Sequence, residues 1–140
     1  MSNSPRLYEN TLAVFYDEEL EAAEMVGVAG VRCPGEEFNR LALEGERLVF
    51  VVTEHRELIV ALQVFNGFEI RHPVLAKGQR VLAAGEIEIL HVGVVKLVTD
   101  LTNKSGHYEP HADSLSVAVE VLTRHGYDVP PEVVRPYPGE

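Results

Sequence analysis

The segment Ser105–Pro110 concentrates side chains that could do chemistry. Ser105, His107 and Tyr108 supply a hydroxyl, an imidazole and a phenol within four positions. An imidazole ordinarily titrates near pH ~6.5, so it can donate or accept a proton at working pH. Gly106 would let the backbone approach a ligand closely. The spacing therefore predicts a polar site in which His107 acts as a general acid or base beside Ser105 and Tyr108.

Two residues from an earlier part of the chain could join this site. His72, in Arg71-His72-Pro73, is a second candidate imidazole that follows a cation. Glu86 follows Gly85 inside an apolar run, so its carboxylate either acts as the acid of the site or faces solvent. The alternation Glu86-Ile87-Glu88-Ile89 favours the solvent-facing side of a strand. Two imidazoles and a hydroxyl would suit acid–base transfer on a small molecule or a protein side chain.

Each of these residues also has a purely structural interpretation. Ser105-Gly106 could form only a turn between a strand and the last helix, and Tyr108 is interpreted as a buried ring with its hydroxyl satisfied. His72 could cap backbone groups in a loop, and His107 could be buried with both ring nitrogens bonded to backbone. The two interpretations separate on whether the rings of His72 and His107 open into one cavity.

A metal site is not predicted. His107 and His111 are four residues apart with Asp113 close behind, but such a pair binds metal mainly on a helix, and Pro110 interrupts this one. Cys33 is the single cysteine, so no internal disulfide and no cysteine-based zinc site can form. Because it lies among small apolar residues, we interpret it as buried and unreactive. The chain carries no nucleotide-binding or other cofactor motif, and no cofactor is expected.

The segments that hold these residues resemble a known family. The residues that carry the resemblance are Arg71-His72-Pro73-Val74-Leu75, Gly78, Val81, Ala84-Gly85-Glu86 and Asn103-Lys104-Ser105-Gly106-His107-Tyr108-x-Pro110, before an amphipathic helix that ends at Gly126. They resemble a small bacterial domain found at the C-termini of secreted polymorphic-toxin-type proteins. A segment of plant calmodulin-binding proteins that carry an IQ motif is also similar. The resemblance spans roughly residues 47 to 128 and implies a toxin-like or effector-like domain.

Two departures limit what the resemblance implies. His111 stands where relatives often carry serine or threonine after the proline, so the start of the last helix is expected to differ. The calmodulin-binding segment itself, with its Ile-Gln start and spaced basic residues, is absent, and calmodulin is not implied as a partner. The resemblance therefore indicates where a site lies and specifies no activity.

The elements that must position the motif read as one α+β domain over residues 1–140. We expect a mainly antiparallel sheet of five to seven strands with a C-terminal helix packed on it. The apolar residues at helical spacing in that helix are Leu115, Ala118, Val119 and Leu122. Asp113 is its expected N-cap, and Gly126 is the expected residue beyond its end. Residues 1–10 and 127–140 are expected to be extended or loosely held.

The strands are predicted from apolar runs. Leu48–Val52 is apolar at every position, so we expect a central strand buried on both faces. Asn66-Gly67 lies between apolar runs and predicts a hairpin with a type I′ turn. Val81–Ile89 and Val94–Leu101 form the strand pair that leads into the motif. Within that pair, Gly85 predicts a bulge or a close backbone approach.

The remaining segments are predicted as follows. Leu12–Tyr16 is expected to form a short strand, and Asp17–Met25 a helix that acidic residues begin. Leu41–Leu43 reads as one arm of a hairpin that turns at Glu44-Gly45-Glu46. Arg71–Gly78 is expected to be a connector.

Composition excludes several classes of partner. The net charge of -10 repels nucleic acid and anionic lipid at long range, so nucleic acid is disfavoured. No apolar run approaches the roughly 20 residues that cross a bilayer, so no membrane partner is expected. The N-terminus lacks the apolar core of a signal peptide, which predicts a cytoplasmic protein or one exported without a classical signal peptide. A small molecule or a protein is the expected partner, with a homo-oligomer as an alternative.

Three hypotheses about function follow. The leading one is a toxin-like or effector-like domain whose polar pocket is lined by His72, Ser105, His107 and Tyr108, with Glu86 as a further acid. The alternative is a non-enzymatic module that binds a protein or assembles with its own copies, supported by the apolar strands and the proline-rich tail. In the third, the motif only closes the turn onto the last helix. Whether the chain is an enzyme stays open.

Overall fold

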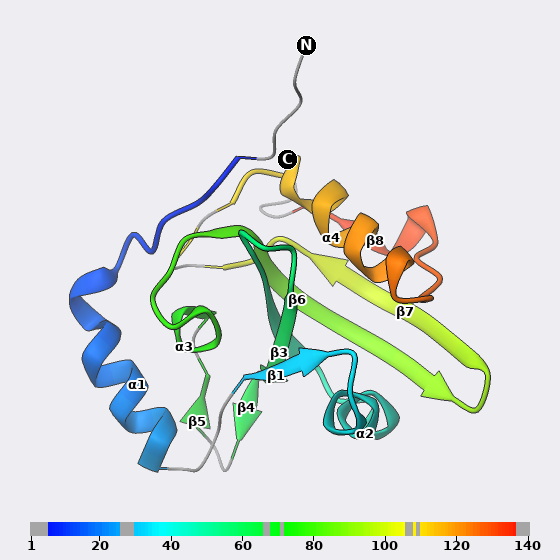
Figure 1. Cartoon of the computed structure of the whole chain (residues 1–140), viewed down its shortest axis with the longest axis horizontal. Helices are drawn as coiled ribbons and strands as arrows, with labels where there is room; N and C mark the ends of the chain where they lie inside the picture. Colours follow the sequence, from blue (N-terminus) through cyan, green and yellow to red (C-terminus); the bar gives the residue numbers. More distant parts are fainter. Residues whose placement is uncertain are drawn as a thin grey trace.

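The computed structural model describes residues 6–25, 30–65, 68–70, 72–105, 108 and 110–136. Within these residues the fold is α+β, built on a six-stranded mixed sheet of order β1-β3-β2-β6-β7-β8 (Figure 1). The strands are β1 (Val31–Cys33), β2 (Leu48–Thr53), β3 (Leu58–Leu62), β6 (Val81–Val92), β7 (Val95–Thr102) and β8 (Val134–Arg135), and β4 (Val64–Phe65) and β5 (Phe68–Glu69) form a separate hairpin. The helices are α1 (Tyr16–Met25), α2 (Glu36–Glu44), α3 (His72–Ala76) and α4 (Ser114–Arg124), with 3-10 turns η1 (Ala13–Phe15) and η2 (Pro131–Val133).

The sheet is antiparallel except at one edge, where β8 runs parallel to β7. The continuous apolar run in β2 places it between β3 and β6, and its residues Leu48–Val52 are all buried. A strand buried on both faces needs apolar side chains at every position, because neither face meets water. The predicted class, mainly antiparallel sheet and central strand are therefore confirmed.

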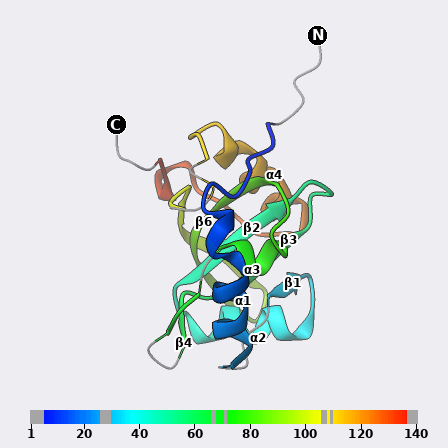
Figure 2. The same ribbon diagram turned by 90° about the vertical axis from the view of Figure 1, so that its left-hand side faces the viewer.

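Helices cover both faces of the sheet. Phe38 of α2 and Leu122 of α4 belong to one buried cluster with Phe50 of β2. α1 and α3 belong to the other cluster, in which Val51 and Tyr108 are buried. Figure 2 shows α1 and α3 in front of the strands, on the side opposite α4. Alternate residues of β2 thus feed two separate cores, as the pleat of a central strand requires.

Helix α4 packs on the sheet as the apolar stripe predicts, with Leu115, Ala118 and Leu122 buried. Gly126, at φ +88, follows its C-terminal end as expected. The expected cap is wrong, because the Asp113 side chain makes no capping hydrogen bond. The turn before α4 already supplies acceptors: Ser114 N donates to His111 O at 3.0 Å, and Ser116 N donates to Asp113 O at 3.2 Å. The first amides of α4 are therefore satisfied by backbone.

Two expected strands are helical. Leu12–Tyr16 forms η1 and the first residue of α1, and Leu41–Leu43 lies in α2. Phe38, Leu41 and Ala42 recur at three- and four-residue spacing, and this helical period outweighs the alternation that suggested a strand. Gly45, at φ +68, ends α2 instead of turning a hairpin. The expected helix over Asp17–Met25 is confirmed as α1, which begins one residue earlier.

Further segments are more ordered than expected. Tyr8 exchanges backbone hydrogen bonds with Val81, at 2.7 and 2.9 Å, so residues 6–10 are not simply loose. Tyr127 is buried, and η2 and β8 interrupt the expected extended tail. The expected connector holds the short helix α3. Strands β4 and β5 pair across Asn66-Gly67, although that dipeptide lies outside the described residues. Among the residues described, no helix is long and apolar enough to cross a membrane.

Candidate functional site

The predicted motif meets the sheet where β7 ends beside β6. A Cβ atom on Gly85 would lie 1.8 Å from Thr102 O, so only glycine lets the chain leaving β7 cross β6 here. This is the close backbone approach that the sequence predicts. His72 Nε2 lies 2.7 Å from Gly85 O. Because a carbonyl oxygen only accepts, Nε2 carries the proton, and the bond ties α3 to β6.

The described residues of the motif are buried and bonded to backbone. Tyr108 N donates to Ser105 Oγ at 3.3 Å, and the Tyr108 hydroxyl donates to Gln79 O at 2.8 Å. His72, Ser105 and Tyr108 are only 7%, 6% and 2% exposed. Burial raises the pKa of Tyr108 far above its ordinary value. These three residues converge on the end of β7 as predicted, in the protein interior.

His107 lies outside the described residues, as does Gly106. The structure therefore places His72, Ser105 and Tyr108 but not the imidazole expected to act as general acid or base. A cavity shared by His72 and His107 stays a prediction. The interpretation of Tyr108 as a buried ring with a satisfied hydroxyl is confirmed.

Glu86 is buried, so the solvent-facing position favoured by strand alternation is wrong for this residue. It is 7% exposed, whereas the Glu88 side chain is 39% exposed. Arg47 Nε and Gln63 Nε2 each donate to a different Glu86 oxygen at 2.8 Å, and both side chains reach it from outside β6. Within the described structure, Glu86 belongs to a charge network formed by Arg47, Gln63, Glu86, Glu88, Asp100 and Arg135.

Asp100 joins the charge network to β8. Arg135 Nε and Nη2 donate to its two carboxylate oxygens at 2.7 and 2.8 Å, and Arg47 Nη1 donates at 2.9 Å. The hydrogen bond from Arg135, with that from Arg47, holds the pKa of Asp100 below its ordinary value although burial opposes this. A carboxylate bonded to both oxygens by a guanidinium is well placed to hold structure together.

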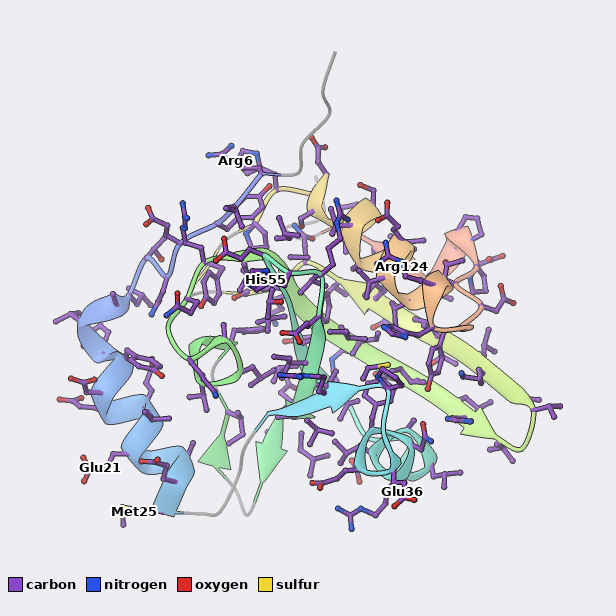
Figure 3. All side chains as sticks on the ribbon, in the orientation of Figure 1. Arg6, Glu21, Met25, Glu36, His55 and Arg124 are labelled. Carbon is purple, nitrogen blue, oxygen red and sulfur yellow. The ribbon has the colours of Figure 1, made fainter. Side chains whose placement is uncertain are left out.

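The surface is hollowed at a different place, where the N-terminal segment, the β2–β3 turn and the start of α4 meet. This hollow, called the α4 hollow below, has a volume of about 730 Å³. Its apolar floor is formed by Tyr8, Leu82 and Val117, and its polar rim includes Arg6, Arg56 and His111. Figure 3 labels Arg6 on the N-terminal segment, close to the start of α4.

Arg6 is held at the rim by two aromatic rings. Its guanidinium lies 5.4 Å from the centroid of Tyr8, and its Nη1 lies 3.4 Å from His111 Nδ1. The rings of Tyr8 and His111 are 5.9 Å apart at 59°. Because arginine only donates, Nδ1 is the acceptor, and the His111 imidazole is neutral with its proton on Nε2. A cation–π contact and a hydrogen bond thus position this cation.

Arg56 reaches the rim from the β2–β3 turn. It adopts φ +62, a left-handed conformation that is uncommon for residues other than glycine. Its Nη1 donates to Glu120 Oε1 at 2.8 Å, which directs the side chain across the hollow to α4. Strained backbone of this kind costs about 1–3 kcal/mol and clusters at functional sites.

The α4 hollow can bind an anion. Two guanidinium groups, an imidazole N–H and the hydroxyls of Ser114 and Ser116 border it. Asp113 and Glu120 also lie on its rim, so the local charge is balanced, in a chain whose net charge is -10. Across the residues that the structure describes, no group of three or more potential metal ligands occurs.

The sequence did not predict this site. Arg6 lies in a segment expected to be loose, Arg56 in a polar turn, and His111 was weighed only as a metal ligand. Among the predicted site residues that the structure describes, which are His72, Ser105, Tyr108 and Glu86, none lines the hollow. No sequence signal links Arg6 to Arg56, because fifty residues separate them.

Neither a family model, nor a curated protein, nor a solved structure matches this chain.

Proposed function

We propose that this chain is a small-molecule-binding domain that holds an organic anion in the α4 hollow. The observation that carries the proposal is the pair of guanidinium groups, from Arg6 and Arg56, above an apolar floor in a hollow of about 730 Å³. Small-molecule sites commonly measure about 300–1,000 Å³ and combine apolar walls with a few polar groups. Guanidinium groups bind carboxylate or phosphate oxygens through paired hydrogen bonds.

The lining favours one kind of ligand. An acidic group would contact Arg6 and Arg56, while an apolar or aromatic body would cover Leu82 and Val117. Glu120 already binds Arg56 at 2.8 Å, and Asp113 adds a second carboxylate to the rim. These carboxylates would repel a polyphosphate, so a ligand with a single acidic group fits best.

Titration calorimetry and amide NMR with benzoate, phenylpyruvate and adenosine monophosphate test this proposal. We expect at least one of these anions to bind and to shift the amide signals of Arg56 and Ser116. Arg6→Gln and Arg56→Gln should each weaken binding about tenfold, which corresponds to a lost charged hydrogen bond of about 1.4 kcal/mol.

The matched control is Arg40→Gln on α2, whose side chain is 67% exposed and makes an ion pair with Glu37. It removes the same charge without touching the hollow, so binding should be unchanged. Equal weakening by all three substitutions would reduce the effect to overall charge and contradict the proposal. No binding of any of the three anions would do the same.

Acid–base chemistry in a toxin-like or effector-like domain is the second proposal. It is favoured by the convergence of His72, Ser105 and Tyr108 beside Gly85. His107→Ala and His72→Ala would have to remove an activity while leaving the fold intact. If both variants only lower the free energy of unfolding, these residues are structural.

A further inference from the structure

The hairpin of β6 and β7 extends past the rest of the sheet. Strand β2 begins at Leu48, opposite Ile87, so Glu88–Val92 of β6 pair only with β7 among the described residues. Figure 1 shows the end of this hairpin projecting from the body of the molecule. The side of β6 that faces away from β7 is therefore a strand edge without a neighbouring strand over these positions.

One side of the projecting hairpin is apolar and exposed. Val92 pairs with Val95, and Leu90 pairs with Leu97, so these four residues, called the hairpin patch below, share one face. Leu90, Val92 and Val95 are 40%, 55% and 48% exposed. An apolar patch beside an unpaired strand edge commonly marks an interaction surface.

The edge lacks the usual protection against pairing. Natural sheets keep exposed edges apart with lysine, proline or bulky turns. Here the edge positions beyond Glu88 are Ile89, Leu90, His91 and Val92. A strand with unpaired backbone groups and alternating apolar side chains is a template for an added strand.

Acidic groups border the hairpin patch. On β6, Glu86 and Glu88 occupy the same face as Leu90 and Val92, because alternate residues of a strand point the same way. The charge network contains three carboxylates, from Glu86, Glu88 and Asp100, and two guanidinium groups, from Arg47 and Arg135. The Glu88 carboxylate keeps a 39% exposed side chain. The surface beside the patch therefore carries an excess of negative charge.

We propose that the edge of β6 from Glu88 to Val92 binds an extended segment of a partner protein, one that alternates apolar and basic residues. The segment would continue the line of β2 and form backbone hydrogen bonds with β6. Its apolar side chains would pack on Leu90 and Val92, and a lysine or arginine would face Glu88. The net charge of -10 favours a basic partner further.

A second copy of this chain fits the edge less well. Two copies would each bring a net charge of -10 to the interface. A stable dimer also buries about 800 Å² per partner, far more than four side chains supply. A short basic strand meets neither obstacle, since its affinity would come from backbone hydrogen bonds and a few anchoring side chains.

The probe is a synthetic peptide that alternates valine and lysine, measured by fluorescence anisotropy with the full chain. We expect binding that weakens about tenfold when Leu90→Ser and Val92→Ser are combined. The control combines Val14→Ser and Met25→Ser, which replace residues 83% and 81% exposed at η1 and α1, and it should bind as the parent does. A peptide with glutamate in place of lysine should bind about tenfold more weakly.

Blocking backbone pairing separates an added strand from simple charge attraction. A valine–lysine peptide methylated on alternate backbone nitrogens should lose binding, because it cannot donate hydrogen bonds to the edge. Equal binding of methylated and unmethylated peptides, or equal loss in the two serine pairs, overturns the proposal. So does sedimentation that shows a dimer dispersed by Leu90→Ser and Val92→Ser, which would assign the edge to a second copy.

Discussion

The end of β7 and the α4 hollow contain the same kinds of residue in opposite settings. At the end of β7, His72, Ser105 and Tyr108 are buried and bond to backbone groups. At the hollow, His111 and Ser116 are exposed, and Tyr8 lines open space. Histidine, serine and tyrosine can therefore close a fold or border a binding site, and the crossing of the chain above them decides which.

The crossing at Gly85 gives the largest expected effect on this comparison. Gly85→Ala would place a methyl group 1.8 Å from Thr102 O, so the chain leaving β7 must move. We expect the free energy of unfolding to fall by more than about 4 kcal/mol, measured by urea denaturation.

Gly35→Ala is the matched control, because its Cβ would meet Arg32 O at an ordinary 3.5 Å. It should change the free energy of unfolding by less than about 1 kcal/mol. Similar values for the two alanine variants would contradict a crossing that requires glycine.

Tyr108→Phe tests the buried end at a single hydrogen bond. The substitution removes the donor to Gln79 O, at 2.8 Å, while the ring stays in place. The free energy of unfolding should fall by about 1–2 kcal/mol in thermal or urea unfolding. Anion binding in the α4 hollow should not change, and a change there would mean that the two regions are coupled.

The sequence predicts more of the fold than of the site. The unbroken apolar run of β2 and the stripe of α4 each specify an element, because burial on a sheet or helix face needs that period. In α2 two periods compete, and alternation at Leu41 and Leu43 hid the helical spacing from Phe38. Pattern alone cannot choose between them, since Leu43 is left 60% exposed.

Side chains from distant segments account for the errors at the site. Glu86 alternates with apolar residues, yet Arg47 and Gln63 cover it from outside β6. The α4 hollow depends on Arg6, Arg56 and His111, which lie on three separate segments. Local periodicity holds no information on such long-range contacts, so the sequence located the motif and missed the cavity.

Acid should weaken the charge network before it affects the hollow. The pKa of Asp100 is lowered in the folded state, so its contribution to stability is complete above its unfolded value, ~3.9. That contribution is lost as pH falls through the lower folded value. Arg135→Gln should therefore reduce the loss of stability between about pH 4 and pH 2, measured by urea denaturation. An unchanged acid slope would contradict the hydrogen bond as its cause.

Arg56→Gly gives the smallest expected effect on stability and a clear effect on binding. Glycine relieves the left-handed strain at φ +62, a gain of about 1 kcal/mol. The lost ion pair with Glu120 offsets part of it, by about 0–1 kcal/mol. Thermal unfolding should shift little, whereas calorimetry should show weaker anion binding. A large loss of stability would mean that Arg56 serves structure and not the hollow.

The most direct test is an amide NMR titration of the chain with the anion that binds most tightly. The shifts should concentrate on Arg56, Ser116 and Val117 at the hollow and leave His72 and Ser105 unchanged. Shifts centred on His72 and Ser105, with none at the start of α4, would contradict the central claim. They would return the site to the residues at the end of β7.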